Sequence, residues 1–173
     1  SISYSQLGDI GLADKYAEEY FKIIELYRES TPRKYLDSIL FAIATLIVRG
    51  DNYINQSLEL YKSVLLFCEE SIEPNCYRQG DIFRGIGLRY VFSGNYHDGE
   101  AYLQKALKYY ENNENSGLYN SQDYEILETY YGLFQVYLAI RSFDKAVDMA
   151  TRRLELTKRQ FGPTSSAYIG ALN

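Results

Sequence analysis

Few residues of this 173-residue chain have the type and spacing that enzyme chemistry needs. The single histidine, His97, belongs to no recognisable nucleophile or metalloprotease motif. The glycines of residues 85–94 lie in or after an expected helix, whereas a dinucleotide-binding loop would follow a strand. The adjacent carboxylates Glu69 and Glu70 project in different directions on a helix, so we interpret them as solvated charges. We therefore expect a non-catalytic chain with no metal site and no cofactor.

The two cysteines, Cys68 and Cys76, leave two interpretations open. We favour a buried helix thiol and a separate loop thiol, because two cysteines in a helical chain of this size are no disulfide framework. A disulfide would require the intervening turn to bring the two residues together. Metal binding is disfavoured because His97 is the only histidine that could add a ligand.

The charge of the chain argues against nucleic acid as its main partner. The formal net charge is −5, whereas binding to a phosphate backbone needs clustered lysines and arginines. The densest basic run is Arg152-Arg153 with Lys158-Arg159, in the last half of an expected helix, where cations favour the helix dipole. We interpret this run as a solvated face.

The apolar pattern predicts a globular chain that does not enter a membrane. Hydrophobic residues make up 46% of the sequence and charged residues 24%. The longest apolar run, residues 39–48, is too short to span a bilayer. We expect a cytoplasmic protein, although the chain begins with Ser1 and a processed N-terminus stays an alternative.

Residues 83–110 carry the clearest structural pattern of the chain. Apolar and small residues recur there at helical spacing in two segments, separated by a turn at residues 93–95. The first face consists of Phe83, Ile86, Gly87, Tyr90 and Val91, and the second of Gly99, Leu103, Ala106, Leu107 and Tyr110. Glycine inside a helix costs roughly 1 kcal/mol relative to alanine. Gly87 therefore predicts a close contact between the two helices.

This helix pair resembles the tetratricopeptide repeat (TPR). The family pattern, an aromatic residue, then Leu-Gly, then Tyr, is matched by Phe83, Ile86, Gly87 and Tyr90. Gly99 takes the place of the small alanine that opens the second helix. The resemblance implies an all-α, right-handed α-solenoid of antiparallel helix hairpins. A HEAT-like array is the alternative fold, disfavoured by the glycine and tyrosine spacing.

The resemblance extends over nearly the whole chain, which we expect to be one domain, 1–173, cut from a longer protein. We expect a partial repeat at 1–30, three repeats at 33–73, 78–112 and 123–162, and the start of a truncated helix at 164–173. The small residues at equivalent positions, about 42 to 47 residues apart, are Ala13, Ser57, Gly99 and Ala146. This period is longer than the usual 34 residues or so. Together with the stop at residues 161–163, it is similar to the kinesin light chain type.

A TPR-like fold implies a concave groove that binds a peptide or helix of a partner protein. From their positions in the first helix of each repeat, the residues expected to face the groove are Leu40, Ala44, Arg84, Leu88, Tyr131 and Gln135. An alternative is that Leu40, Leu88 and Tyr131 are packed between repeats. Arg84 is the only basic residue among these six, so we expect no clamp for the acidic C-terminal tails that chaperones present.

The leading hypothesis is therefore a protein-interaction scaffold. The alternative is a regulatory, sensor or self-association region of a larger signalling protein. Homodimerisation through an exposed end repeat is a third hypothesis.

Overall fold

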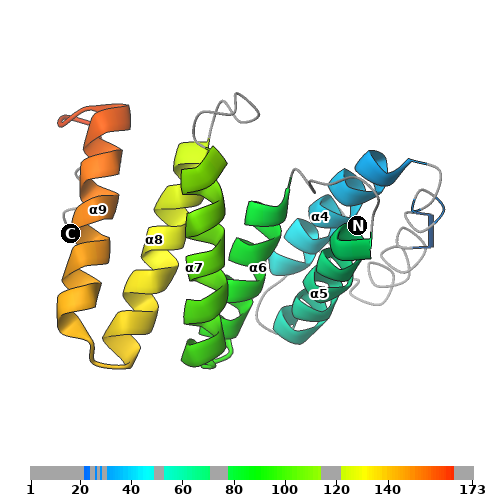
Figure 1. Cartoon of the computed structure of the whole chain (residues 1–173), viewed down its shortest axis with the longest axis horizontal. Coiled ribbons are helices and arrows are strands. Elements are labelled where there is room, and N and C mark those ends of the chain that lie inside the picture. Colours follow the sequence, from blue (N-terminus) through cyan, green and yellow to red (C-terminus); the bar gives the residue numbers. More distant parts are fainter. Residues whose placement is uncertain are drawn as a thin grey trace, which may run out of the picture. The chain divides into compact units, whose positions relative to one another are not determined.

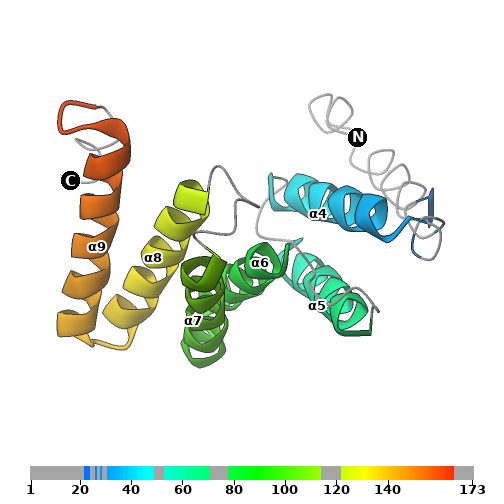
Figure 2. The ribbon, with the colours of Figure 1, turned by 45° about the horizontal axis from the view of Figure 1, so that its top comes forward.

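The computed structural model describes residues 22, 23, 26, 28, 31–48, 53–70, 78–113 and 122–165. Every regular element in these ranges is helical (Figures 1 and 2). The helices are α4 (Pro32–Val48), α5 (Ile54–Glu70), α6 (Gln79–Phe92), α7 (Tyr96–Asn113), α8 (Gln122–Ala139) and α9 (Phe143–Phe161). The expectation of an all-α chain is confirmed.

The chain divides into two compact units, Ser1–Phe67 and Cys68–Asn173. We call them unit 1 and unit 2. The expectation of a single domain stays a prediction. The partial repeat expected at 1–30 and the truncated helix at 164–173 fall almost entirely outside the described residues.

In unit 1, α4 buries one face and leaves Phe41 and Ala44 exposed on the other, although its apolar sequence suggests a helix covered on most sides. The helix begins at Pro32, whose missing N–H costs nothing at the first helical position. The edge of the Tyr35 ring meets the Phe67 ring with 4.7 Å between the ring centroids. Tyr35 lies near the start of α4 and Phe67 near the end of α5, so this contact joins the start of one helix to the end of the other.

Unit 2 is a row of four helices in which each packs on the next and α8 also packs on α6 (Figure 1). Its hydrophobic core takes side chains from all four helices. The buried members are Val91, Leu103, Leu133, Val136, Tyr137 and Ala146. Residues from both expected repeats of this unit therefore share one core.

The helices α6 and α7 approach closely at Gly87. A Cβ atom on Gly87 would lie 2.7 Å from Leu103 Cγ and 3.0 Å from the Leu103 backbone nitrogen. A Cβ on Gly99 would lie 3.3 Å from the Gly87 carbonyl oxygen. The close contact that the mid-helix glycine predicts is confirmed, and Gly99 provides the small surface expected of the TPR alanine.

The turn between α6 and α7 is a Schellman motif. Gly94 adopts a φ of 81°, and its N–H donates to the Val91 carbonyl oxygen at 3.0 Å. The Asn95 N–H donates to the Tyr90 carbonyl oxygen at 2.9 Å. Asn95 also caps α7, because its Oδ1 accepts from the Asp98 N–H and its Nδ2 donates to the Asp98 carboxylate. The turn expected at residues 93–95 is confirmed.

The turn between α8 and α9 repeats this geometry 47 positions later, with Arg141 in place of Gly94. The Arg141 N–H donates to Leu138 and the Ser142 N–H to Tyr137, in the register of the first turn. Arg141 has a φ of 59°, which is rare for a residue with a Cβ. Arg141 and Ser142 therefore take the places of Gly94 and Asn95, and the repeat length here is 47 residues.

We predict that Arg141→Gly stabilises the protein. A non-glycine residue in the left-handed region costs about 1–2 kcal/mol, and glycine loses more chain entropy on folding. The free energy of unfolding in urea should therefore rise by about 0.5–1 kcal/mol. Arg141→Ala keeps the Cβ and is the matched control, with no gain expected. A loss of stability in Arg141→Gly would contradict this account of the turn.

We predict the opposite sign for Gly87→Ala. At an exposed helix position this change would stabilise a helix by roughly 1 kcal/mol. Here the new methyl group would meet Leu103, so the free energy of unfolding should fall by about 1–3 kcal/mol. A higher free energy of unfolding on chemical denaturation would show that the contact between α6 and α7 accommodates a methyl group at residue 87.

Candidate functional site

A groove with a volume of about 490 Å³ opens between α6 and α8, near the start of α7. None of the residues that line it is charged. They are Leu88, Val91, Phe92, Tyr96, Tyr131, Gly132, Gln135, Leu138 and Ala139. The groove is lined by one unit only, so its geometry depends on unit 2 alone.

The floor of the groove exists because α8 approaches α6 and α7 at a glycine. A Cβ on Gly132 would lie 2.9 Å from Leu88 Cδ2 and 2.9 Å from Leu103 Cδ1. Val91 and Leu88 pack against the core below. The rim carries apolar side chains that remain in water, since Phe92 is 57% exposed and Leu138 is 40% exposed.

Three of the six groove candidates from the sequence lie together in this groove. Leu88, Tyr131 and Gln135 all line it. Leu40 is a core residue of α4 with 8% of its surface exposed, whereas Ala44 on the same helix is exposed. Both belong to unit 1, so their place in a groove shared with the residues of unit 2 stays a prediction.

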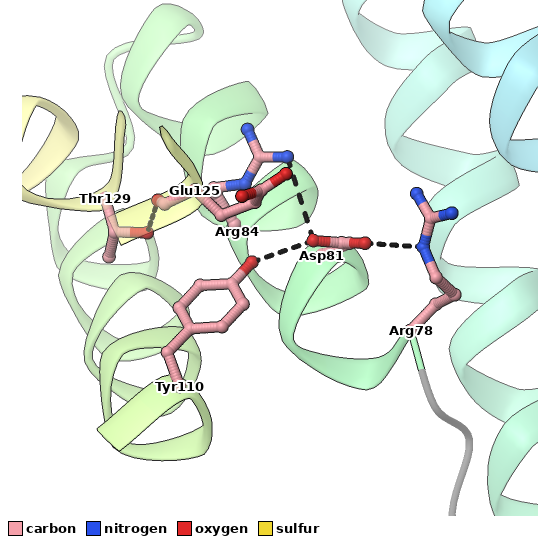
Figure 3. A network of polar contacts seen from close by, with 6 residues as sticks. All are labelled: Arg78, Asp81, Arg84, Tyr110, Glu125 and Thr129. Carbon is pink, nitrogen blue, oxygen red and sulfur yellow. Dashed lines mark hydrogen bonds and ion pairs between the residues drawn. The ribbon is translucent and has the colours of Figure 1, made fainter. Parts of the chain in front are cut away.

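Arg84, the remaining candidate, belongs to a polar network on α6 and α7 (Figure 3). The Asp81 carboxylate accepts from Arg78 Nε and from the Tyr110 hydroxyl, the latter at 3.0 Å. Arg84 forms an ion pair with the same carboxylate at 3.9 Å. Asp81 therefore holds two arginines and a tyrosine, and the Arg84 side chain is only 21% exposed. The charge of Arg84 is therefore used in a contact with Asp81 within the same helix.

The Tyr110 hydroxyl is buried at this network. Burial raises the pKa of Tyr110 far above its ordinary value, and the negative charge of Asp81 raises it further. The phenol stays neutral throughout the physiological range and serves as a hydrogen-bond donor. This donor links the last turns of α7 to the first turn of α6.

Arg153 differs from the solvated cation expected from the basic run. Its guanidinium carbon lies 5.0 Å from the centroid of the Tyr131 ring, a cation–π contact. Its Nε is buried without a hydrogen-bond partner. The neighbouring Arg152 fits the expectation better, since it is half exposed and pairs with Asp148 on the same helix face. Sequence spacing could not find the Arg153 contact, because it depends on how α9 docks on α8.

A second hollow of about 480 Å³ lies among α7, α8 and α9. Half of its lining residues are charged, in contrast to the groove. They are Leu107, Glu111, Ile126, Tyr130, Arg152, Glu155, Leu156 and Arg159. Burial raises the pKa of Tyr130, and Arg152 beside it acts in the opposite direction. Charges of both signs and a wide opening favour no single ligand class here.

The part of the chain that the structure describes holds no cluster of three or more potential metal ligands. The His97 side chain is almost fully exposed at 95%. Cys68 is buried and disulfide-bonded, so the interpretation of Cys68 as a free thiol is wrong. The other cysteine of the sequence, Cys76, lies outside the described residues. Within the described ranges, every helix is too short or too polar to cross a bilayer.

We predict that Tyr110→Phe destabilises the protein at neutral pH. A hydrogen bond to a charged group contributes about 1.5–3 kcal/mol, so the free energy of unfolding should fall by about that amount. Because the folded pKa is raised, the stabilisation by Tyr110 is complete below the unfolded value of about 10 and is lost above it. Denaturation above pH 10 should therefore depend less on pH in Tyr110→Phe. Tyr124→Phe, at an exposed tyrosine, is the control, and equal loss in both variants would contradict the network.

No family model matches this chain, and no curated protein matches it. The crystal structure of BtubC (BKLC) from P. vanneervenii is similar to it, with a TM-score of 0.71 and 18% sequence identity. The match covers 92% of this chain and 61% of that chain, so this chain spans less than two thirds of BtubC. At this identity the likeness shows the fold alone, and the fold is an all-α helical-repeat solenoid.

Proposed function

We propose that this chain is a non-catalytic TPR-type scaffold and that the groove of unit 2 binds an apolar segment of a partner protein. The observation that carries the proposal is the uncharged groove of about 490 Å³ with exposed apolar side chains on its rim. Water is displaced from such a surface when an apolar side chain enters it, at roughly 25 cal/mol per Å². The proposed anchor of the partner is therefore one or two large apolar side chains.

The few polar groups of the groove suit a peptide backbone. Gln135 can donate and accept at the same time, which matches the N–H and C=O groups of an extended chain. The hydroxyl groups of Tyr96 and Tyr131, which also line the groove, can likewise donate and accept hydrogen bonds. Tyrosine rings bury apolar area while their hydroxyls stay hydrated, as is common in protein-binding surfaces.

Charge does not drive this binding. The groove is uncharged, and the chain carries a net charge of −5, so the proposal names a protein segment and excludes a phosphate backbone. Arg84 is committed to Asp81 and is mostly buried, which supports the expectation that the chain has no clamp for acidic tails. Binding should then change little with salt concentration.

The family assignment also belongs to the proposal. The turn between α6 and α7 recurs 47 residues later as the turn between α8 and α9. This period is longer than the usual TPR period of about 34 residues and supports units similar to the kinesin light chain type. The cytoplasmic location expected from the sequence has less support. Disulfide bonds are rare in the cytosol, and Cys68 is disulfide-bonded.

We predict that peptides selected on this protein from a random display library bind through the groove. Leu138→Asp should weaken their binding at least tenfold, about 1.4 kcal/mol, by placing a charge at the rim. Tyr131→Ala should weaken binding as well while thermal unfolding stays cooperative. Calorimetry or fluorescence anisotropy with a selected peptide measures both effects.

The matched control is Leu66→Asp, because Leu66 is an exposed leucine on α5 that does not line the groove. It should leave peptide binding unchanged. Peptides that bind Leu138→Asp and Tyr131→Ala as tightly as the unmodified chain would refute the groove. Loss of cooperative unfolding in Tyr131→Ala would show that this tyrosine is a core residue.

A further inference from the structure

Helix α9 carries an apolar stripe in which every side chain except the half-buried Leu154 is exposed. Its side chains recur at helical spacing along one side of the helix, next to the row that contains the core residue Ala146. The stripe consists of Phe143, Val147, Ala150, Leu154 and Phe161. Phe143 is 61% exposed, Val147 64% and Phe161 52%, values that are high for large apolar side chains in a packed helical unit.

The repeat itself identifies this stripe as a helix-binding face. The position on α7 that corresponds to Ala150, 47 residues earlier, is Leu103, which is fully buried. Leu103 is covered by α8, whose Gly132 approaches it closely. The position that corresponds to Phe143 is Tyr96, which packs against the same core. The surface that α8 covers on α7 is therefore left open on α9.

The charges beside the stripe are arranged so that the face complements itself. Asp144 lies in the first turn of α9, and Lys158 lies in the last turn. At 100° per residue both flank the stripe on the same side. Neither forms an ion pair with another residue of the described ranges. An antiparallel copy of the helix would bring Asp144 of one chain to Lys158 of the other, twice.

We propose that α9 pairs with α9 of a second copy of this chain, antiparallel and about a two-fold axis near the middle of the helix. In this pairing Phe143 of each copy meets Phe161 of the other, and Ala150 meets Leu154. A two-fold interface places the same patch on both subunits, which requires the self-complementarity described above. The antiparallel helix dipoles also attract each other.

This dimer is independent of the groove proposal. The groove is lined by residues of α6, α7 and α8, whereas the stripe belongs to α9 alone. A dimer can therefore form whether or not the groove binds a peptide, and each proposal has its own variants. A helix of another protein could also cover the stripe. Such a pairing would not require the charges beside the stripe to complement those of an antiparallel copy of α9.

The test is sedimentation velocity of the purified chain over a wide range of concentrations. We expect a reversible dimer, and Val147→Asp should weaken it at least tenfold because two carboxylates would be buried at the interface. Val147 is mostly exposed in the single chain, so the variant should fold, and circular dichroism confirms this. Phe92→Asp, at a similarly exposed groove residue, is the matched control and should dimerise normally.

A charge exchange tests the antiparallel arrangement. Asp144→Lys alone and Lys158→Asp alone should each weaken the dimer, because each places like charges together. The double variant Asp144→Lys/Lys158→Asp should restore it. A monomer at all concentrations, a dimer that survives Val147→Asp, or a double variant no stronger than the single ones would each overturn the proposal.

Discussion

Leu103 of α7 is the contact on which the structure of unit 2 depends. It is fully buried, and a glycine approaches it from each side. Gly87 brings α6 to within van der Waals contact of its Cγ, and Gly132 brings α8 to its Cδ atoms. One leucine side chain therefore fills the space between two helices that lack side chains at the point of contact. Larger residues at either glycine would separate the helices and disturb the core.

The groove follows from this contact. Because Gly132 has no side chain, α8 lies close to Leu88 and leaves a hollow above it that Phe92 and Leu138 border. The cations on the neighbouring helix faces are held elsewhere. Arg84 pairs with Asp81, and Arg153, which does not line the groove, stacks on the Tyr131 ring. The apolar character of the groove thus depends on where the polar side chains are bound as much as on which residues line it.

The features that the sequence could predict are those that depend on local spacing. The close contact at Gly87, the turn at residues 93–95 and the helix stop at Gly162, whose φ is 80°, each follow from a short motif. The left-handed conformation of Arg141 follows from its alignment with Gly94. These features are set within one helix hairpin, so a repeat pattern is enough to find them.

Features that depend on docking between hairpins were beyond the sequence. The residue of α8 that lies 47 positions after Gly87 is Phe134, yet Gly132 makes the close contact with the preceding hairpin. The repeat pattern places Leu40 and Arg84 at positions that face the groove. In the structure Leu40 is buried in the hydrophobic core and Arg84 binds Asp81. The position of a residue in the repeat pattern assigns it to a face of its helix. It does not assign the neighbour that covers that face, because crossing angles depend on all packed side chains together.

The contact between Gly87 and Leu103 also has a consequence for the order of folding. The two residues are close in sequence, and the tight turn at Gly94 joins their helices, so this contact costs little loop-closure entropy. The contact of Gly132 with Leu88 spans a much longer stretch of chain. Chains rich in local contacts fold fast, so the α6–α7 hairpin should form first and present Leu103 as the surface on which α8 later condenses. The groove would then be the last part of unit 2 to take shape.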